Sequence, residues 1–351
     1  MRPRMPMEQG RQMTLPPLPP VFTTEEARAL GISPYYLTQL VRSGRVRRIR
    51  KATYAVAETV TAHARGDHHL LLARISLTQR GPHHALSHLS AAAAHGLPLP
   101  LGMSETVHLT SLSGTARTRR ASGLWVHHAD SSETEVDLVG TLLTTTASRT
   151  VADCLRHFPP RTGVPIADAA LHRRLTTGKE VLAQLNMQCH WTGRAKFADA
   201  ATPLVDGRRE SWLESYAAVL FSEWGVDPPT PQLIIVDAQD RFVARADAGW
   251  QEDATVIELD GKSKYLIPSG TAEVDPEARW EMEKDRYDRI GNLGVERIRF
   301  GLSHLHQEAV MVQRRIHDRR AAGSVDRFTG SFHSLPDSGL VIPSIWDLPA
   351  A

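Results

Sequence analysis

The sequence predicts an α/β fold of the α+β kind, in three parts. A small helical module with a basic ribbon comes first, a central α/β region follows, and a mixed sheet flanked by helices closes the chain. Three observations predict this arrangement: two short capped helix patterns before residue 45, alternating helix-like and strand-like runs in the middle, and the order α-β-β-β-α-β from residue 208 onward. A length of 351 residues accommodates two or three such domains.

The bulk composition excludes several classes of protein. Hydrophobic residues make up 41% of the chain and charged residues 23%, which is ordinary for a soluble globular protein. The two cysteines, Cys154 and Cys189, are too few for a disulfide framework and suit a reducing cytoplasm. No apolar run is long enough to cross a bilayer, and residues 1–19 lack the apolar core of a secretory signal. We therefore expect a cytoplasmic protein with no membrane partner and a disordered leader over residues 1–19.

Two short helices are predicted near the N-terminal end. Thr23 is placed as an N-cap with glutamates in the first turn, and Gly31 ends this first helix. Ser33 caps a second helix, which has Pro34 at its first position and runs to Gly44. Two short helices joined by a glycine-containing turn form a helix-turn-helix.

The segment that follows predicts a wing. Residues 45–56 alternate like a strand and their polar positions are largely basic, so residues 20–62 read as a winged helix with DNA as its partner. The alternative is structural, because helical hairpins are common and a short basic strand can simply keep a sheet edge in solvent. The candidate major-groove residues are Tyr35, Tyr36, Thr38, Gln39 and Arg42, and the candidate phosphate contacts are Arg47, Arg48 and Arg50.

Residues 63–200 are predicted as a central α/β domain. The expected helices cover residues 86–95, 148–156, 164–175 and 179–185, and the expected strands cover residues 106–110 and 123–128. The histidines of this region raise a zinc site as an alternative function: His83, His84, His88, His95, His127 and His128. A zinc-peptidase motif needs a glutamate after the first histidine of an i, i+4 pair, and Ala85 stands there between His84 and His88. Packed or solvated histidines are therefore the favoured interpretation.

From Arg208 the pattern changes to a helix followed by strands. The expected elements are a helix over residues 210–225, strands over 232–236, 242–247 and 255–260, a charged helix over 276–290 and a last strand over 295–300. The segment 323–351, rich in Gly, Ser and Pro, is expected to be a flexible tail.

Carboxylates gather on the strands of this predicted sheet. Asp247 and Glu258 are 11 residues apart (258 − 247) on neighbouring strands, so their side chains can converge on one cation. Glu258 and Asp260 are two residues apart and share a face. Carboxylates beside a lysine suit phosphodiester hydrolysis, because Mg²⁺ or Mn²⁺ activates water and an ammonium group neutralises charge on the phosphate. The hairpin acids could thus share one cation, and the preceding helix adds Glu214, with Glu210 as the alternative.

The same acids also have a structural interpretation. Three carboxylates on an apolar sheet repel one another, and burying them unpaired is costly. Ion pairs with Lys262, Lys264 or Arg245 would offset that cost as a cation would. Asp260-Gly261 is in addition a good turn signal. The pattern therefore predicts either a cation site or an ion-paired strand end.

Residues 205–308 resemble the PD-(D/E)XK nuclease superfamily, and within it the very-short-patch-repair-like endonucleases. The matching residues, in chain order, are Glu214, Asp247, Glu258-Leu259-Asp260-Gly261, Lys264 and Glu283-Lys284-Asp285-Arg286. The resemblance implies a restriction-endonuclease-like mixed sheet, with Mg²⁺ held by Asp247 and Glu258 and with Lys264 against the scissile phosphate or the water. One departure is that Asp260 replaces the lysine expected two residues after the glutamate.

Two further roles accompany this resemblance. Glu214 would orient a second cation or a water molecule. Lys284 and Arg286 would contact phosphates, although pairing with Glu281 and Glu283 along the same helix accounts for them equally well.

Residues 20–200 resemble antitoxins of the abortive-infection AbiEi family. The resemblance rests on the winged helix and on the segments His84–Pro98, Val107–Thr110 and Thr144–Asp153. It implies a protein that binds operator DNA, represses its own toxin operon and has a cognate toxin as partner, as in a type IV toxin–antitoxin system.

Two functions follow from these patterns. The first is a DNA-binding protein whose C-terminal domain hydrolyses DNA with Mg²⁺, using Glu214, Asp247, Glu258, Asp260 and Lys264 as its catalytic set. The alternative is a transcriptional repressor or antitoxin without catalysis, in which the nuclease fold is degenerate and serves contact with DNA or a partner.

Overall fold

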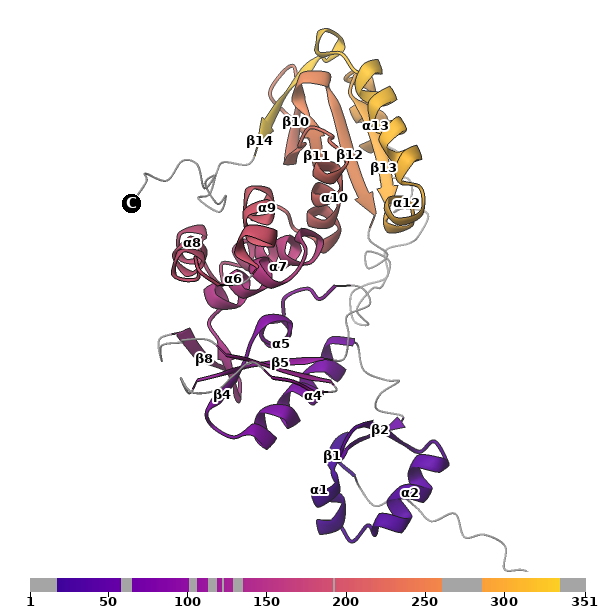
Figure 1. Ribbon diagram of the computed structural model, residues 1–351. Helices are drawn as coiled ribbons and strands as arrows, with labels where there is room; N and C mark the ends of the chain where they lie inside the picture. Colours follow the sequence, from indigo (N-terminus) through magenta and orange to yellow (C-terminus); the bar gives the residue numbers. More distant parts are fainter. Residues whose placement is uncertain are drawn as a thin grey trace, which may run out of the picture. The chain divides into compact units, whose positions relative to one another are not determined.

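The computed structural model describes residues 18–57, 65–100, 106–112, 119–121, 123–128, 135–191, 193–260 and 286–334. Nearly all of the expected leader, and the candidate residues Lys264 and Lys284, lie outside the described residues. The fold is mixed α+β, as the sequence predicts (Figure 1). The chain divides into two compact units: residues 1–86 with 104–131, and residues 87–103 with 132–351. They are called the first and the second unit below.

The N-terminal part of the first unit has the arrangement of a winged helix. Its elements are β1 (Val21–Thr23), α1 (Thr24–Ala29), α2 (Pro34–Arg42), β2 (Val46–Arg50) and β3 (Thr53–Val56). The three strands form an antiparallel sheet in the order β1-β3-β2. The predicted caps are confirmed, since Thr23 and Glu26 form a capping box and the Ser33 hydroxyl accepts from the backbone of α2. Apolar side chains from both helices and the sheet close the core, among them Phe22, Leu37 and Leu40.

In the rest of the first unit, the described residues form one helix and four short strands. They are α4 (Arg65–Arg80), β4 (His84–Leu86), β5 (Val107–Ser111), β6 (Arg119–Ala121) and β7 (Leu124–His128). The strands lie in the order β6-β7-β5-β4, with β5 and β7 parallel and the other pairs antiparallel. The strands β5 and β7 were predicted from the sequence, whereas α4 was not.

The second unit begins with a helical layer. Its elements are α5 (His88–Ala94), the antiparallel strands β8 (Val136–Val139) and β9 (Leu142–Thr145), α6 (Ala147–His157), α7 (Pro160–His172), α8 (Gly178–Met187), the π-helical turn η2 (Arg194–Ala198), α9 (Asp199–Ala201) and the 3-10 turn η3 (Thr202–Leu204). One continuous apolar core joins α5 to α10, and it includes Val151, Leu155 and Leu171. The predicted helices of this region are therefore present, with ends shifted by a few residues.

The C-terminal sheet carries most of the predicted carboxylates. Its elements are α10 (Trp212–Glu223), β10 (Thr230–Asp237), β11 (Phe242–Trp250), η4 (Gln251–Asp253), β12 (Thr255–Asp260), β13 (Glu296–Gly301), α12 (Leu302–Gln307), α13 (Ala309–Ala322), η6 (Val325–Arg327) and β14 (Gly330–Ser334). The strand order is β13-β12-β11-β10-β14, and only β12 and β13 run parallel. Helices α10, α12 and α13 share one apolar core with this sheet, and a second core lies around Leu233, Ile235 and Val256 (Figure 1).

Part of the expected flexible tail is built into this sheet. Strand β14 pairs with β10 from Leu233↔Ser334 to Asp237↔Gly330, and the ring of Phe328 packs at a tilt against that of Phe332, with centroids 4.4 Å apart. A Cβ at Gly330 would lie 2.1 Å from the Val236 carbonyl oxygen, so the strand approaches as closely as it does because residue 330 has no side chain. The sequence of β14 is short and polar, and the strand it pairs with, β10, lies far earlier in the chain. The local pattern therefore predicted a flexible tail and not a strand. Within the described ranges, no helix joins the length and the apolar character that crossing a bilayer requires.

Candidate nucleic-acid interface and carboxylate site

The exposed face of α2 carries three of the predicted DNA-binding residues. Tyr35 is 75% exposed, and Thr38 and Arg42 are exposed as well. Their spacing of i, i+3 and i+7 places them along one side of the helix. Tyr36 and Gln39 are only half-buried, and Tyr36 packs against the core with its hydroxyl buried. Of the five predicted major-groove residues, three therefore face solvent, and Tyr36 and Gln39 are partly buried.

The wing presents arginines to solvent. Arg47 and Arg48 are exposed on β2, opposite Ala55 and Tyr54 of β3. No ion pair involves either side chain among the described residues of the structure. The register shifts between Arg48 and Arg50, and the side chain of Arg50 lies outside what the structure describes. Together with exposed Arg42, this surface has a positive charge that local acids do not neutralise.

Glu214 is the most enclosed of the predicted catalytic acids. It lies on α10 and is 8% exposed. Its carboxylate accepts hydrogen bonds from the Ser211 hydroxyl at 2.6 Å, from the Glu210 backbone N–H at 3.0 Å and from the Gln232 amide at 2.8 Å. Burial raises the pKa of Glu214, the nearby charge of Asp247 raises it further, and the hydrogen bonds lower it. An environment of this kind is common at functional sites.

Asp247 lies on β11 beside Glu214. One of its carboxylate oxygens accepts from the Leu259 backbone N–H at 2.6 Å, which fixes the side chain against β12. Asp247 and Glu214 line the same small pocket of about 10 Å³, the size of a single water molecule. The last register pair between β11 and β12 is Ala248↔Ile257, so the next position along this register sets Asp247 opposite Glu258. The sequence spacing predicted that Asp247 and Glu258 lie on neighbouring strands, and this register is consistent with that prediction.

The other predicted acids are held by arginines. Glu258 accepts from Arg286 at 2.7 Å, and the same guanidinium donates to the Arg245 carbonyl. Asp260 accepts from Arg299 at 2.9 Å. These are ion-paired strand ends, but their partners are Arg286 and Arg299 instead of the lysines considered from the sequence.

Arg245 pairs elsewhere, with Glu210 at 2.9 Å. Within the described residues, no three carboxylates bring one oxygen each to within 4.8 Å of one another. Two acids, Glu214 and Asp247, share a pocket, while the arginine pairs occupy Glu258 and Asp260. The structure does not describe Lys262, Lys264 and Lys284, so their predicted roles stay predictions.

Gln232 belongs to this site and was not predicted. It is 2% exposed, has a left-handed backbone (φ +54) and lies between the register pairs Pro231↔Ala248 and Leu233↔Ala246, opposite Asp247. Such a backbone costs a residue other than glycine free energy, and strained positions of this kind gather at functional sites. The only sequence signal for it was a glutamine at the start of the apolar run Leu233–Val236.

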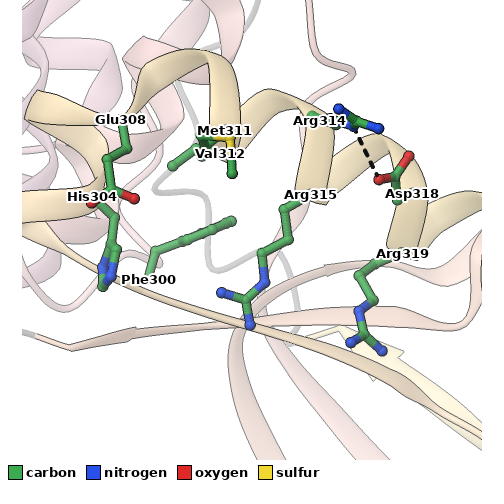
Figure 2. A pocket seen from close by; sticks show the side chains of 9 residues that line it. All are labelled: Phe300, His304, Glu308, Met311, Val312, Arg314, Arg315, Asp318 and Arg319. Carbon is green, nitrogen blue, oxygen red and sulfur yellow. Dashed lines mark ion pairs between the residues drawn. The ribbon is translucent and has the colours of Figure 1, made fainter.

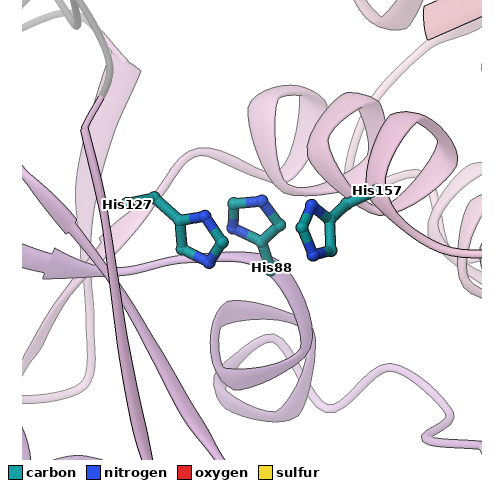
Figure 3. Close-up of side chains that lie close together, drawn as sticks. All are labelled: His88, His127 and His157. Atoms are coloured by element: carbon teal, nitrogen blue, oxygen red, sulfur yellow. The ribbon is translucent and has the colours of Figure 1, made fainter. Parts of the chain in front are cut away.

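Figure 3 draws two of the histidines weighed as zinc ligands, His88 and His127, together with His157. In the second unit the rings of His88 and His157 meet edge to face, with centroids 4.9 Å apart. In the first unit His127 hydrogen-bonds to His108 at 2.9 Å. His84 lies in β4 and His88 begins α5, so the i, i+4 spacing of this pair is not that of one helix. A helical two-histidine zinc motif is therefore not formed at this position.

Comparison with known proteins supports the N-terminal assignment. A family model described as "Transcriptional regulator, AbiEi antitoxin" matches residues 18–57. These residues are the winged helix, so the predicted resemblance to this family is confirmed for that segment. A search of curated proteins found no match to the chain.

Proposed function

We propose that this protein is a transcriptional regulator that binds DNA through residues 18–57. The observation that carries the proposal is the outward face of α2, with Tyr35, Thr38 and Arg42, next to the exposed wing arginines Arg47 and Arg48. The match of the same residues to an antitoxin and regulator family supports it.

In this proposal the recognition helix and the wing do different work. A recognition helix reads base edges with a few side chains near its N-terminal half, and Tyr35 and Thr38 occupy that half of α2. Wing arginines neutralise phosphates, which sets affinity and register on the duplex but does not read sequence. Tyr36 is only half-buried and packs against the apolar core of the module, so it is left out of this contact set.

Selection from a random duplex library with the full-length protein tests this proposal. An enriched sequence is expected for the wild type. Arg47→Gln with Arg48→Gln should weaken binding to all duplexes and reduce the slope of log affinity against log salt by roughly 1 for each phosphate that is no longer neutralised. Thr38→Ala should instead relax the enriched sequence with a smaller loss of affinity. Lys179→Gln with Arg174→Gln, at two exposed positions of the second unit, removes the same number of charges and is the control. A library that shows no enrichment, with binding equal in wing variant and control, would refute the proposal.

Two finer proposals rest on the family description. We propose that the protein acts as an antitoxin with a cognate toxin as partner, and that it works in the cytoplasm, where thiols such as exposed Cys189 stay reduced. Copurification of tagged protein with the products of the genes flanking its own tests the partner. Recovery of none of them under conditions in which the protein binds its operator would count against an antitoxin role.

A second candidate function is Mg²⁺-dependent hydrolysis of DNA by the second unit. The observation that favours it is the pocket shared by Glu214 and Asp247, in which two carboxylates face a space of about 10 Å³. Two hard oxygen donors suit Mg²⁺ or Mn²⁺. Arg209 also lines this pocket and pairs with Asp168 at 2.8 Å, and Arg286 pairs with Glu258, so a cation would be held by Glu214 and Asp247 alone while these pairs last. A bound cation would activate water and offset negative charge on the phosphate.

The chain's own residues would prepare that site. The Leu259 backbone N–H holds the Asp247 carboxylate in place, and the Gln232 amide orients Glu214 toward it. Arg286 would exchange Glu258 for a phosphate oxygen, since both are anionic acceptors that suit a guanidinium. This exchange would move Arg286 from Glu258 to the DNA.

Incubation of the purified protein with supercoiled plasmid and Mg²⁺ or Mn²⁺ tests hydrolysis. Nicked or linear DNA is expected, with the rate reduced at least about a hundredfold in Asp247→Asn. Asp240→Asn, in the exposed turn before β11, is the matched control and should cut at the wild-type rate. Intact plasmid with both metals and the wild-type protein would leave the regulator as the function of this chain.

A further inference from the structure

An open groove of about 550 Å³ lies on the second unit, far along the chain from the winged helix. The end of β13, helix α12 and one side of α13 form it, and it is called the α13 groove below. Its lining residues are Phe300, His304, Glu308, Met311, Val312, Arg314, Arg315, Asp318 and Arg319 (Figure 2). A space of this size is far larger than a single ion requires.

The arginines of the α13 groove differ in how they are neutralised. Arg314 pairs with Asp318 at 3.7 Å, and Figure 2 shows this pair apart from the other two guanidinium groups. Arg319 pairs with Glu296 at 3.0 Å. Arg315 is exposed, lies 5.7 Å from the centre of the Phe300 ring and has no acidic partner among the residues that the structure describes. The charge of Arg315 is therefore not neutralised by any described acid. The charge of Arg319 is neutralised by one acid, the half-buried Glu296.

The groove is charged along one part and apolar along another. Arg315 and Arg319 are one turn apart and extend from the same side of α13, while Glu308 lies at the opposite end, beside His304 (Figure 2). Phe300 and Val312 form a buried apolar floor, and Met311 is 63% exposed at the rim. A ligand that fits must be anionic where it meets the arginines and able to cover apolar surface beside them.

We propose that the α13 groove binds the sugar–phosphate backbone of DNA, as a second contact beyond the winged helix. The proposal rests on the proposed function that the protein binds DNA. A phosphate can accept two parallel hydrogen bonds from the Arg315 guanidinium, and Arg319 lies one turn away for the same or the next phosphate. Deoxyribose can cover Met311 and the apolar floor without any base being read. The contact therefore adds affinity and salt dependence and leaves the recognised sequence unchanged.

Fluorescence anisotropy of the full-length protein with a labelled 30-bp random duplex, measured over a range of KCl concentrations, tests the proposal. Arg315→Gln should lower the affinity several-fold near 0.1 M salt and reduce the slope of log affinity against log salt by about 0.9, the value expected for one phosphate. Arg315→Lys should keep the wild-type salt slope because it keeps the charge, but restore only part of the affinity because an ammonium group cannot form the two parallel hydrogen bonds. Lys179→Gln removes the same charge from an exposed site of the same unit and should behave as the wild type.

The wing variant Arg47→Gln with Arg48→Gln separates this proposal from the proposed function. Weaker binding in the wing variant, with Arg315→Gln equal to Lys179→Gln, would overturn the groove contact and leave the winged helix as the DNA-binding site. Weaker binding in Arg315→Gln alone would support the groove contact and refute the winged helix. An unchanged melting temperature in Arg315→Gln shows that a loss of binding is not a loss of folding. A salt slope in Arg315→Lys that falls as far as in Arg315→Gln would also overturn the proposal, because the lysine keeps the charge that the phosphate contact requires.

Discussion

At the scale of single residues, burial sets the pKa of several acids, and burial cannot be inferred from the local sequence. Asp168 on α7 is fully buried and pairs with Arg209 at 2.8 Å, yet burial still raises the pKa of Asp168 to about 6, with Arg209 acting in the opposite direction. Glu214 follows the same rule at the carboxylate site. A sequence indicates that such acids exist, but how deeply each is enclosed depends on helices that pack from elsewhere.

Asp168 leads to a prediction about pH. Because the folded-state pKa, about 6, lies above the ordinary 3.8, the contribution of Asp168 to stability is fully present below pH 3.8 and is lost as the pH rises through 6. The wild type should therefore gain roughly 2 kcal/mol relative to Asp168→Asn as the pH falls from 7 to 4. Urea unfolding at several pH values measures this difference. Asp137→Asn, an exposed carboxyl on β8, is the control, and parallel curves for wild type and Asp168→Asn would contradict the prediction.

The candidate site was predictable at residue scale only in part. The spacing of Asp247 and Glu258 indicated neighbouring strands, and the register of β11 and β12 agrees with that. The arginine partners were not predictable, because Arg286 and Arg299 reach the acids through packing and strand pairing over 28 and 39 residues. Gln232 escaped notice for the same reason, since its contact with Glu214 joins a helix to a strand.

Among elements, those with local start and stop signals were predicted well. Helices α1 and α2 have side-chain caps within the helix itself, and both were found from Thr23 and Ser33. Helix α13 has no side-chain cap and buries only Val312 and Ile316, so its sequence resembles a polar connection. Strand β14 is short and polar and depends on β10 for its structure. Elements that depend on distant partners carry little local signal.

The cap of the recognition helix gives a prediction at this scale. The Ser33 hydroxyl accepts from the Tyr36 backbone N–H at 3.1 Å and satisfies one of the free donors of α2. Ser33→Ala should destabilise the winged helix by about 1 kcal/mol, whereas Ser33→Asp should cost much less. Chemical denaturation followed by far-UV circular dichroism measures both variants. Equal stability of Ser33→Ala and the wild type would show that this hydrogen bond contributes nothing.

Strand β14 provides a second prediction about an element. Gly330→Ala would press a methyl group toward the Val236 carbonyl oxygen, which lies 2.1 Å from the ideal Cβ position, so β14 should detach at a cost of about 1–3 kcal/mol. Hydrogen exchange should then show reduced protection at residues 331–334 and on the facing edge of β10. Ser331→Ala, whose side chain is exposed, should retain that protection. Unchanged exchange in Gly330→Ala would contradict the pairing of β14 with β10.

At the scale of the whole molecule, the sequence predicted the fold class and the order of its parts, but not how the chain divides. Residues 104–131 belong to the first unit although they follow the start of the second, so the chain passes between the units more than once. Local patterns cannot show such an exchange. The division nevertheless separates the two candidate functions, because the winged helix lies in the first unit and the carboxylate pocket in the second.

This division predicts that the two functions are independent. Mg²⁺ at a hundred times its dissociation constant should stabilise the wild type by about 2.7 kcal/mol if Glu214 and Asp247 hold it, and Asp247→Asn should abolish that gain. The same variant should bind DNA as the wild type does, because its change lies in the other unit from Arg47 and Arg48. The wing variant should show the reverse, with weaker DNA binding and the full gain from Mg²⁺. Thermal melts with and without Mg²⁺, beside anisotropy on one duplex, measure all four values. A Mg²⁺ gain that survives in Asp247→Asn would place the cation elsewhere, and a loss of both properties in either variant would show that the units depend on each other.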